Sequence, residues 1–277
     1  MKKTFAFTIF ILGAVIALFP QDYRNVENTA WQAGESLTYK VYYHSRMTGS
    51  IKGGTGNFSV RETDTTYDGR EVYRIVAHGK SEGIINFFIK VREHFESFTD
   101  KKALIPHYFI RRTREGHYRK NDEVRFDYDK NKAYSWYDTT DIKMGIQDVV
   151  SVTYFARNMN FDTISEDDMY HVDYFIDDSV YVSAIQFIGY DTIETDYGSY
   201  RCMGFKPKVA VGQVFKEPYP GKLWITDDKN HLPVMAESEV FVGRVRLELI
   251  DAKGVRHRQS ARIIEGEKRM FRRNYAY

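Results

Sequence analysis

A serine between two glycines is the pattern in this chain that comes nearest to a catalytic motif. Gly79-Lys80-Ser81-Glu82-Gly83 matches the G-x-S-x-G of serine hydrolases, and His78 precedes it. That chemistry needs a strand, a sharp turn and a long helix in a parallel sheet, so that the serine is lifted out and the helix N-terminus holds the oxyanion. The flanking residues instead alternate as antiparallel strands do. We therefore predict a bend here and no catalytic residue, with a hydrolase using Ser81 as the minor alternative.

Two further residue patterns could bind metal ions. Asp127-x-Asp129-x-Asn131 begins like a calcium loop, but its sixth position is Lys132 instead of Gly and its twelfth is Asp138 instead of Glu. We interpret it as a hairpin turn. The eight histidines are scattered and there is one cysteine, so the sequence predicts no zinc site, no other metal site and no cofactor. The candidate general acids, none of which the sequence pairs with a partner, are Glu35, Glu93 and Glu96.

The elements that would position such residues are antiparallel strands. Apolar and polar residues alternate with period two, which directs one face inward and the other to solvent. The clearest such segments are Leu37–Tyr43, Tyr73–Ala77, Val124–Tyr128, Val172–Ile176 and Val245–Leu249. Turn-forming residues separate the strands, and these are Gly53-Gly54 with Gly56, Asp68-Gly69, Asp129–Lys132, Asp227–Asn230 and Lys253-Gly254.

Helical pattern is scarce. In residues 148–158, Asp148 can cap free backbone amides, and apolar residues that include Val152 and Phe155 recur at three-and-four spacing. A shorter helix is predicted over Ile84–Phe88. We expect both helices to lie against the sheet, because neither is long enough to form a layer of its own.

The shorter predicted helix is unusually apolar. Five large apolar residues within six positions exceed what a connection needs, so we expect them to be buried. They either plug one end of the core or form a lid over a hydrophobic cavity. In the second case the ligand-binding residues are Ile84, Ile85, Phe87, Phe88, Ile89, Val152 and Phe155.

Residues 1–21 have the composition of a secretory signal. Lys2 and Lys3 precede an apolar run from Phe5 to Phe19, and polar residues follow it. A lipoprotein signal would need a cysteine directly after this run, but the single cysteine is Cys202. We expect a periplasmic protein with a cleaved signal and no lipid anchor. The alternative is an uncleaved membrane anchor, although the run is shorter than the about 20 apolar residues of a spanning helix.

Charge and cysteine content exclude some classes of protein. When Lys2 and Lys3 of the predicted signal are left out, 38 of the 40 Lys and Arg residues remain. They balance the 38 Asp and Glu residues, so the rest of the chain has no net charge and a nucleic-acid partner is not expected. One cysteine allows no intramolecular disulfide. The length predicts a single β domain over residues 22–265. The basic tail, residues 266–277, is expected to be solvated instead of lipid-bound.

A resemblance rests on several motifs taken together. Gly221–Asp228 followed by His231-Leu232-Pro233-Val234 resembles the signature hairpin of an exported bacterial family of unknown function. Gly34-Glu35-x-Leu37-x-Tyr39, Asp148-Val149-Val150-Ser151-x-x-Tyr154 and Gly198-x-Tyr200-x-Cys202 agree with it, so that it covers most of residues 32–252. The resemblance implies a mainly β fold: one strongly curved antiparallel sheet, a half-barrel similar to periplasmic lipoprotein carriers, with one or two short helices in or across the concave face. It implies no activity.

The function expected from these features is non-enzymatic. The curved sheet would hold a hydrophobic ligand, a lipid or a lipoprotein, for the cell envelope. The alternative is a structural or interaction module whose edge strands pair with an envelope protein.

Overall fold

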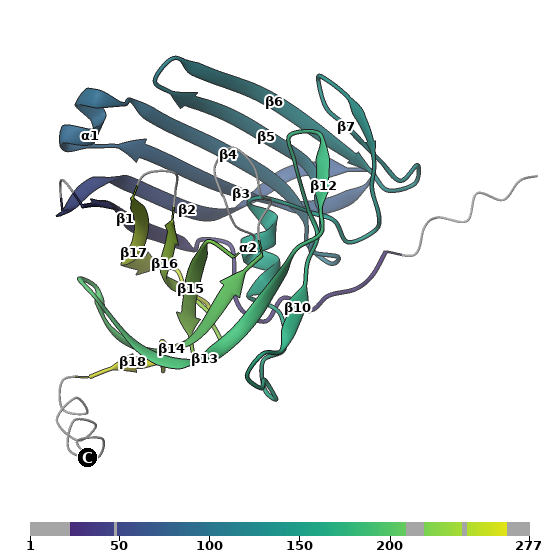
Figure 1. Ribbon diagram of the computed structural model, residues 1–277. Helices are drawn as coiled ribbons and strands as arrows, with labels where there is room; N and C mark the ends of the chain where they lie inside the picture. Colours follow the sequence, from purple (N-terminus) through teal and green to yellow (C-terminus); the bar gives the residue numbers. More distant parts are fainter. Residues whose placement is uncertain (1–22, 47–48, 209–218, 240–242, 265–277) are drawn as a thin grey trace, which may run out of the picture.

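The computed structural model describes residues 23–46, 49–208, 219–239 and 243–264, so the signal predicted over residues 1–21 and the tail 266–277 lie outside the described residues. A large sheet bends around a short helix, α2 (Ser151–Ala156), as Figure 1 shows. Its strands are β1 (Ser36–Ser45), β2 (Gly49–Tyr67), β3 (Arg70–Ser81), β4 (Val91–Asp100), β5 (Pro106–Glu115), β6 (Tyr118–Asp127), β7 (Lys132–Tyr134), β8 (Thr139–Asp141), β10 (Met169–His171), β13 (Ala184–Thr195), β14 (Gly198–Pro207), β15 (Gly221–Thr226), β16 (Pro233–Glu239), β17 (Arg244–Lys253) and β18 (Arg262–Ile263).

The sheet is a meander with one long-range junction. Its order is β10-β13-β14-β15-β16-β17-β1-β2-β3-β4-β5-β6-β7-β8, and β18 pairs with β14. Most neighbours along the chain pair with each other. The exceptions are β10 with β13, β18 with β14 and, at the centre, β1, which pairs with β17 as well as with β2. A small second sheet contains β9 (Gln147–Asp148), β11 (Tyr174–Ile176) and β12 (Ser179–Tyr181). The prediction of a mainly β fold is therefore confirmed. Its large antiparallel sheet is curved and is not closed into a barrel.

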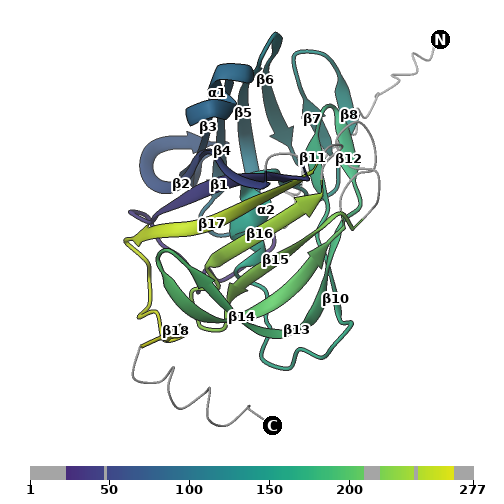
Figure 2. The same cartoon turned by 60° about the vertical axis from the view of Figure 1, so that its left-hand side comes forward.

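Both predicted helices are present. α1 (Gly83–Phe88) connects β3 to β4 at one end of the sheet, and α2 lies in the concavity (Figures 1 and 2). The alternation seen in the sequence explains how the sheet buries its inner face. In β1, Leu37 and Tyr39 are buried while Thr38 and Lys40 are partly exposed. The largest core cluster lies against the β3–β6 half of the sheet and includes Trp31 and Tyr154.

Four of the five predicted turns lie between strands or directly after one, but the prediction for Gly53-Gly54 with Gly56 is wrong. These glycines lie inside β2, a strand of 19 residues. A side chain at position 54 would place its Cβ 2.2 Å from the carbonyl oxygen of Lys80, so glycine is required by close strand approach and not by a turn. The predicted strand 172–176 is interrupted before β11, because Val172 and Asp173 lie between β10 and β11.

Candidate functional site

An apolar cavity of about 410 Å³ lies between α2 and the concave face of the large sheet. Leu37 and Phe58 line it from β1 and β2, Phe205 and Leu247 from β14 and β17, and Val152 from α2. This volume falls in the range of small-molecule sites, which is about 300–1,000 Å³. We call this space the central cavity.

Period-two alternation decides which residues face the central cavity. On β15, Leu223 and Ile225 line it, whereas the intervening Trp224 packs in a separate cluster with Cys202 and Val234. Cys202 is fully buried, and burial raises the pKa of its thiol to about 12. The single cysteine is therefore a packed core residue and not a reactive thiol.

The first turn of α2 is fixed by a buried carboxylate. Asp148 Oδ1 accepts hydrogen bonds from the backbone N–H groups of Val150 and Ser151, both at 2.7 Å, and Oδ2 accepts one from the Ser97 hydroxyl at 2.5 Å. The predicted helix over 148–158 is shorter in the structure: α2 begins at Ser151 with Val150 as its N-cap, and Asp148 accepts from the amides of these two residues from a position before the cap. Burial raises the pKa of Asp148 to about 6, although these hydrogen bonds favour its ionised form.

We expect Asp148→Asn to change how stability depends on pH. A folded-state pKa of about 6 lies above the value of about 3.9 expected when unfolded, so ionisation of Asp148 costs stability as pH rises through this window. Asparagine keeps the oxygen acceptor but does not ionise. The variant should therefore gain about 2 kcal/mol relative to the parent between pH 4 and pH 7. Urea unfolding of both proteins across this range measures the difference, and a constant difference would contradict the prediction.

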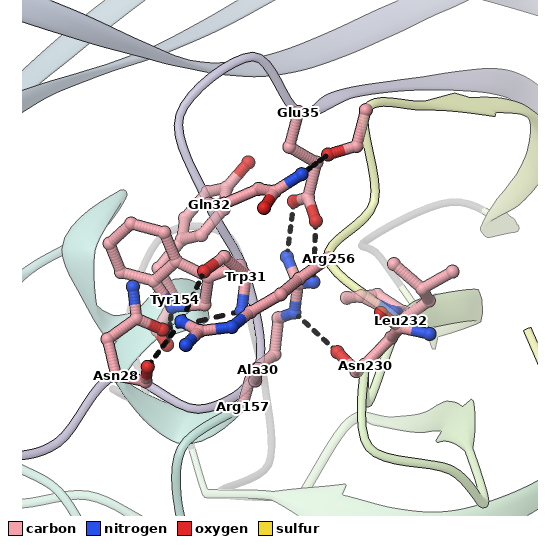
Figure 3. Close-up of polar contacts among 12 residues, drawn as sticks. Asn28, Ala30, Trp31, Gln32, Glu35, Tyr154, Arg157, Asn230, Leu232 and Arg256 are labelled. Carbon is pink, nitrogen blue, oxygen red and sulfur yellow. Dashed lines mark hydrogen bonds and ion pairs between the residues drawn. The ribbon is translucent and has the colours of Figure 1, made fainter. Parts of the chain in front are cut away.

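The last turn of α2 is held by a buried ion pair (Figure 3). Arg157 donates to Glu35 Oε1 at 2.6 Å from Nη1 and to Oε2 at 2.8 Å from Nη2, and its Nε donates to the Asn230 carbonyl at 3.0 Å. The two side chains are 2% and 0% exposed. Burial alone would lower the pKa of Arg157, but the Glu35 carboxylate raises it above its usual value. Glu35, a candidate acid in the sequence, is thus a helix anchor beside the central cavity.

The N-terminal segment fixes the other side of α2. Trp31 Nε1 donates to the Tyr154 carbonyl at 2.9 Å, and the two rings pack edge-on with centroids 5.2 Å apart. Arg256, from the segment after β17, donates to the carbonyls of Trp31 and Asn28. Figure 3 shows the contacts of Trp31 and Arg256 close to the Glu35–Arg157 pair. Sequence reasoning did not single out Trp31, Arg157 or Arg256.

The structure separates the residues that the sequence grouped as ligand-binding. Val152 lines the central cavity, whereas Phe155 packs against the large core cluster, with the Arg24 guanidinium 4.6 Å from its ring centre. Ile84, Ile85, Phe87, Phe88 and Ile89 are not among the cavity-lining residues.

The expectation that the segment 84–89 is buried is wrong. No residue of α1 is buried, and Phe87 and Phe88 are 84% and 73% exposed. The helix follows a strand end and projects beyond the sheet (Figure 1), and although Ile85 lies beside Gly53 of β2, Phe87 and Phe88 stay exposed.

Ser81 lies in a hydrogen-bonded bend. Its hydroxyl donates towards Asn86 Oδ1 and the Ile89 carbonyl, both at 3.0 Å, and accepts from the Val91 N–H at 2.9 Å. None of these partners is a base, and the six-residue α1 follows in an antiparallel sheet. This arrangement lacks the long helix and the parallel strands of a nucleophile elbow.

The remaining candidate acids lie apart from Glu35. Glu96 pairs with Arg74 at 2.6 and 2.8 Å and accepts from His94 at 2.6 Å, whereas Glu93 accepts from the Thr113 hydroxyl at 2.6 Å. Arg74 and His94 lower the pKa of Glu96 against the effect of its burial, while burial raises the pKa of Glu93. The candidate acids therefore do not form a catalytic pair.

Asp127 and Asn131 form the predicted turn between β6 and β7, with Asn131 at a φ of 54°. Within the described parts of the chain, no three or more His, Cys, Asp or Glu side chains are grouped in a way that could hold a metal ion. Among the same residues, neither helix has the length and apolar composition needed to cross a bilayer.

One of the similar solved structures supports the fold. A β-barrel-like protein with the domain of unknown function DUF1849, from Brucella abortus, is similar at a TM-score of 0.54 and 10% sequence identity, covering 80% of this chain and 98% of that one. A protein from Bacteroides fragilis, proposed to be exported and to have a YmcC-like fold, gives a TM-score of 0.32 at 13% identity, with coverages of 82% and 99%. No curated protein matches the sequence.

The family follows from the sequence match. The model of a protein family of unknown function, DUF3108, matches residues 38–250. This range reaches from β1 to β17. The motifs in the β15–β16 hairpin and around α2 lie within this range, and the motif that opens β1 enters it at Tyr39. The chain therefore belongs to the DUF3108 family.

Proposed function

We propose that this protein is an exported, non-enzymatic carrier that holds an apolar ligand, such as the acyl chain of a lipid or lipoprotein, in the central cavity. The observation that carries the proposal is the cavity itself: about 410 Å³ between α2 and the sheet, walled mainly by apolar side chains. Transfer of a ligand into such a space contributes about 0.8 kcal/mol for each CH₂ group removed from water. Export is supported by the composition of residues 1–21.

The charges in the wall favour an acyl chain with an anionic head. The lining residues include two basic side chains, Arg157 and Lys208, and no acidic one. Glu35 already neutralises Arg157. Within the described residues, Lys208 makes no ion pair, and its ammonium group is the one uncompensated charge of the lining. A carboxylate or phosphate head beside Lys208 would complete this charge balance.

Filling the central cavity should reduce binding of a fatty acid. Val152 projects from α2 into the space and is only partly buried, so Val152→Phe adds volume there without a change in charge. We expect the fluorescent fatty acid cis-parinaric acid to bind the parent, and Val152→Phe to weaken this binding at least tenfold, the equivalent of about 1.4 kcal/mol. Fluorescence titration measures the affinity, and native mass spectrometry shows any lipid that co-purifies.

The matched control is Val182→Phe, because Val182 is 68% exposed and does not line the cavity. It should leave the titration unchanged. A parent protein that carries no lipid and does not bind cis-parinaric acid would refute the carrier function. Capture of a stoichiometric envelope protein by that lipid-free form would then favour the interaction module.

A further inference from the structure

Four large apolar side chains project from one end of the sheet without a partner layer. Ile84, Phe87, Phe88 and Ile89 are 59%, 84%, 73% and 53% exposed. They belong to α1 and the residue that follows it, and we call them the apolar tip. Exposed apolar side chains concentrated on so short a segment mark an interaction surface. Figures 1 and 2 both show α1 projecting beyond the ends of β3 and β4.

A row of cations crosses the sheet next to the apolar tip. In consecutive strand pairs, Lys80 lies opposite Arg92, Arg92 opposite Arg114, and Arg114 opposite Arg119. All four line one surface hollow of about 530 Å³. We call these four residues the cationic row. Its first two members lie one residue before the end of β3 and one residue after the start of β4, so they are close to α1 on both sides.

Three of the four cations in the cationic row form no ion pair with a described residue, although Glu93 also lines the hollow. Lys80 pairs with Glu82 at 3.1 Å. Arg92 donates to neutral acceptors, including Asn86 of α1 at 3.0 Å, and Arg119 donates to backbone carbonyls. Among the described residues, no carboxylate forms an ion pair with Arg92, Arg114 or Arg119. Like charges directly opposite one another on neighbouring strands destabilise a sheet, and an external anionic surface would relieve this repulsion.

We propose that the apolar tip and the cationic row dock the protein on an anionic phospholipid bilayer. Aromatic and aliphatic side chains enter the interface between headgroups and acyl chains, while Lys and Arg beside them attract anionic headgroups. Both parts are needed, because apolar insertion and charge attraction add to give stable attachment. A soluble polyanion would fit the cationic row but would leave the apolar tip in water. This proposal does not depend on a ligand in the central cavity.

A fluorescent label on the apolar tip tests the docking in the full-length chain. Cys202 is fully buried, so the new thiol of Phe88→Cys is the accessible one for an environment-sensitive NBD label. We expect the NBD emission to rise and shift to shorter wavelength with vesicles of equal parts phosphatidylcholine and phosphatidylglycerol. Phosphatidylcholine vesicles should give little change, and high salt should reduce the response. The same label on Val182→Cys, exposed beyond β12, should not respond.

The charge requirement is tested in the Phe88→Cys background. Arg114→Gln with Arg119→Gln should weaken the vesicle titration about 25-fold, because each cation near an anionic surface contributes about fivefold. Lys222→Gln with Lys229→Gln removes two exposed cations of the β15–β16 hairpin and should leave it unchanged.

Three outcomes would overturn the docking proposal: no response of the label at position 88 to anionic vesicles, an equal response at position 182, or a response to inositol hexakisphosphate without one to vesicles. The last would assign the row to soluble polyanions. Binding of cis-parinaric acid is measured separately. A failure of membrane docking therefore does not contradict the carrier function, and a failure of ligand binding does not contradict the docking.

Discussion

Replacing Glu35 with alanine is expected to lower the free energy of unfolding by about 3–5 kcal/mol, because a buried charge that loses its partner stays desolvated and uncompensated. Glu35 and Arg157 form a bidentate pair with side chains that are 0% and 2% exposed. In the variant, Arg157 would keep only the Asn230 carbonyl at 3.0 Å as a hydrogen-bond acceptor. Urea or guanidinium unfolding followed by circular dichroism measures the loss.

Two control variants separate the effect of burying the ion pair from the effect of the ion pair itself. Glu237→Ala removes one carboxylate partner of the half-exposed Arg246, which keeps Glu248 at 3.2 Å, and should cost at most about 1 kcal/mol. The double variant Glu35→Leu with Arg157→Met replaces the pair by apolar side chains and should recover most of the stability. A loss below 1 kcal/mol for Glu35→Ala would show that the pair is not desolvated in solution.

Replacing Trp31 with alanine is expected to cost a similar amount, about 3–5 kcal/mol. The side chain is fully buried, packs edge-on against Tyr73 and Tyr154 with ring centroids 5.1 and 5.2 Å away, and donates its indole N–H to the Tyr154 carbonyl. Truncation leaves a cavity beside α2. It also leaves the Tyr154 carbonyl without the indole N–H donor. The loss is measured by the same unfolding experiment.

Trp31→Phe and Trp136→Ala serve as the controls. Phenylalanine keeps most of the apolar contact but not the indole hydrogen bond, so a loss of about 1–2 kcal/mol is expected. Trp136 is 58% exposed, and its removal should change stability by at most about 0.5 kcal/mol. Equal losses for Trp31→Ala and Trp136→Ala would contradict the assigned role of Trp31 in anchoring α2.

Local pattern in the sequence predicted the elements well. Alternation identified strands such as β1 and β17, and the three-and-four spacing with Asp148 located α2. These signals are local, because side-chain direction repeats every two residues in a strand and every 3.6 in a helix. The turn at Asp68-Gly69 was predictable for the same reason, since both residues have positive φ there.

Contacts between distant segments were not predictable. Glycines inside β2 have the composition of a turn, and for Gly54 the approach of the Lys80 carbonyl from the neighbouring strand explains the residue. The segment 84–89 has the composition of a core segment, yet its position at a strand end leaves it exposed. Arg157 could not be identified as the partner of Glu35, because nothing local links residues so far apart.

The central position of β1 constrains the order in which the polypeptide can assemble. Strands β1 to β8 form a continuous series of hairpins from the N-terminal half of the chain, but β1 also pairs Ser36 with Lys253 in β17. This second edge of β1 therefore stays unpaired until the chain as far as Lys253 is available to fold. Pairing across so long a loop is slow, and an unpaired edge strand recruits other chains. A chaperone that shields this edge would prevent aggregation of the half-made sheet.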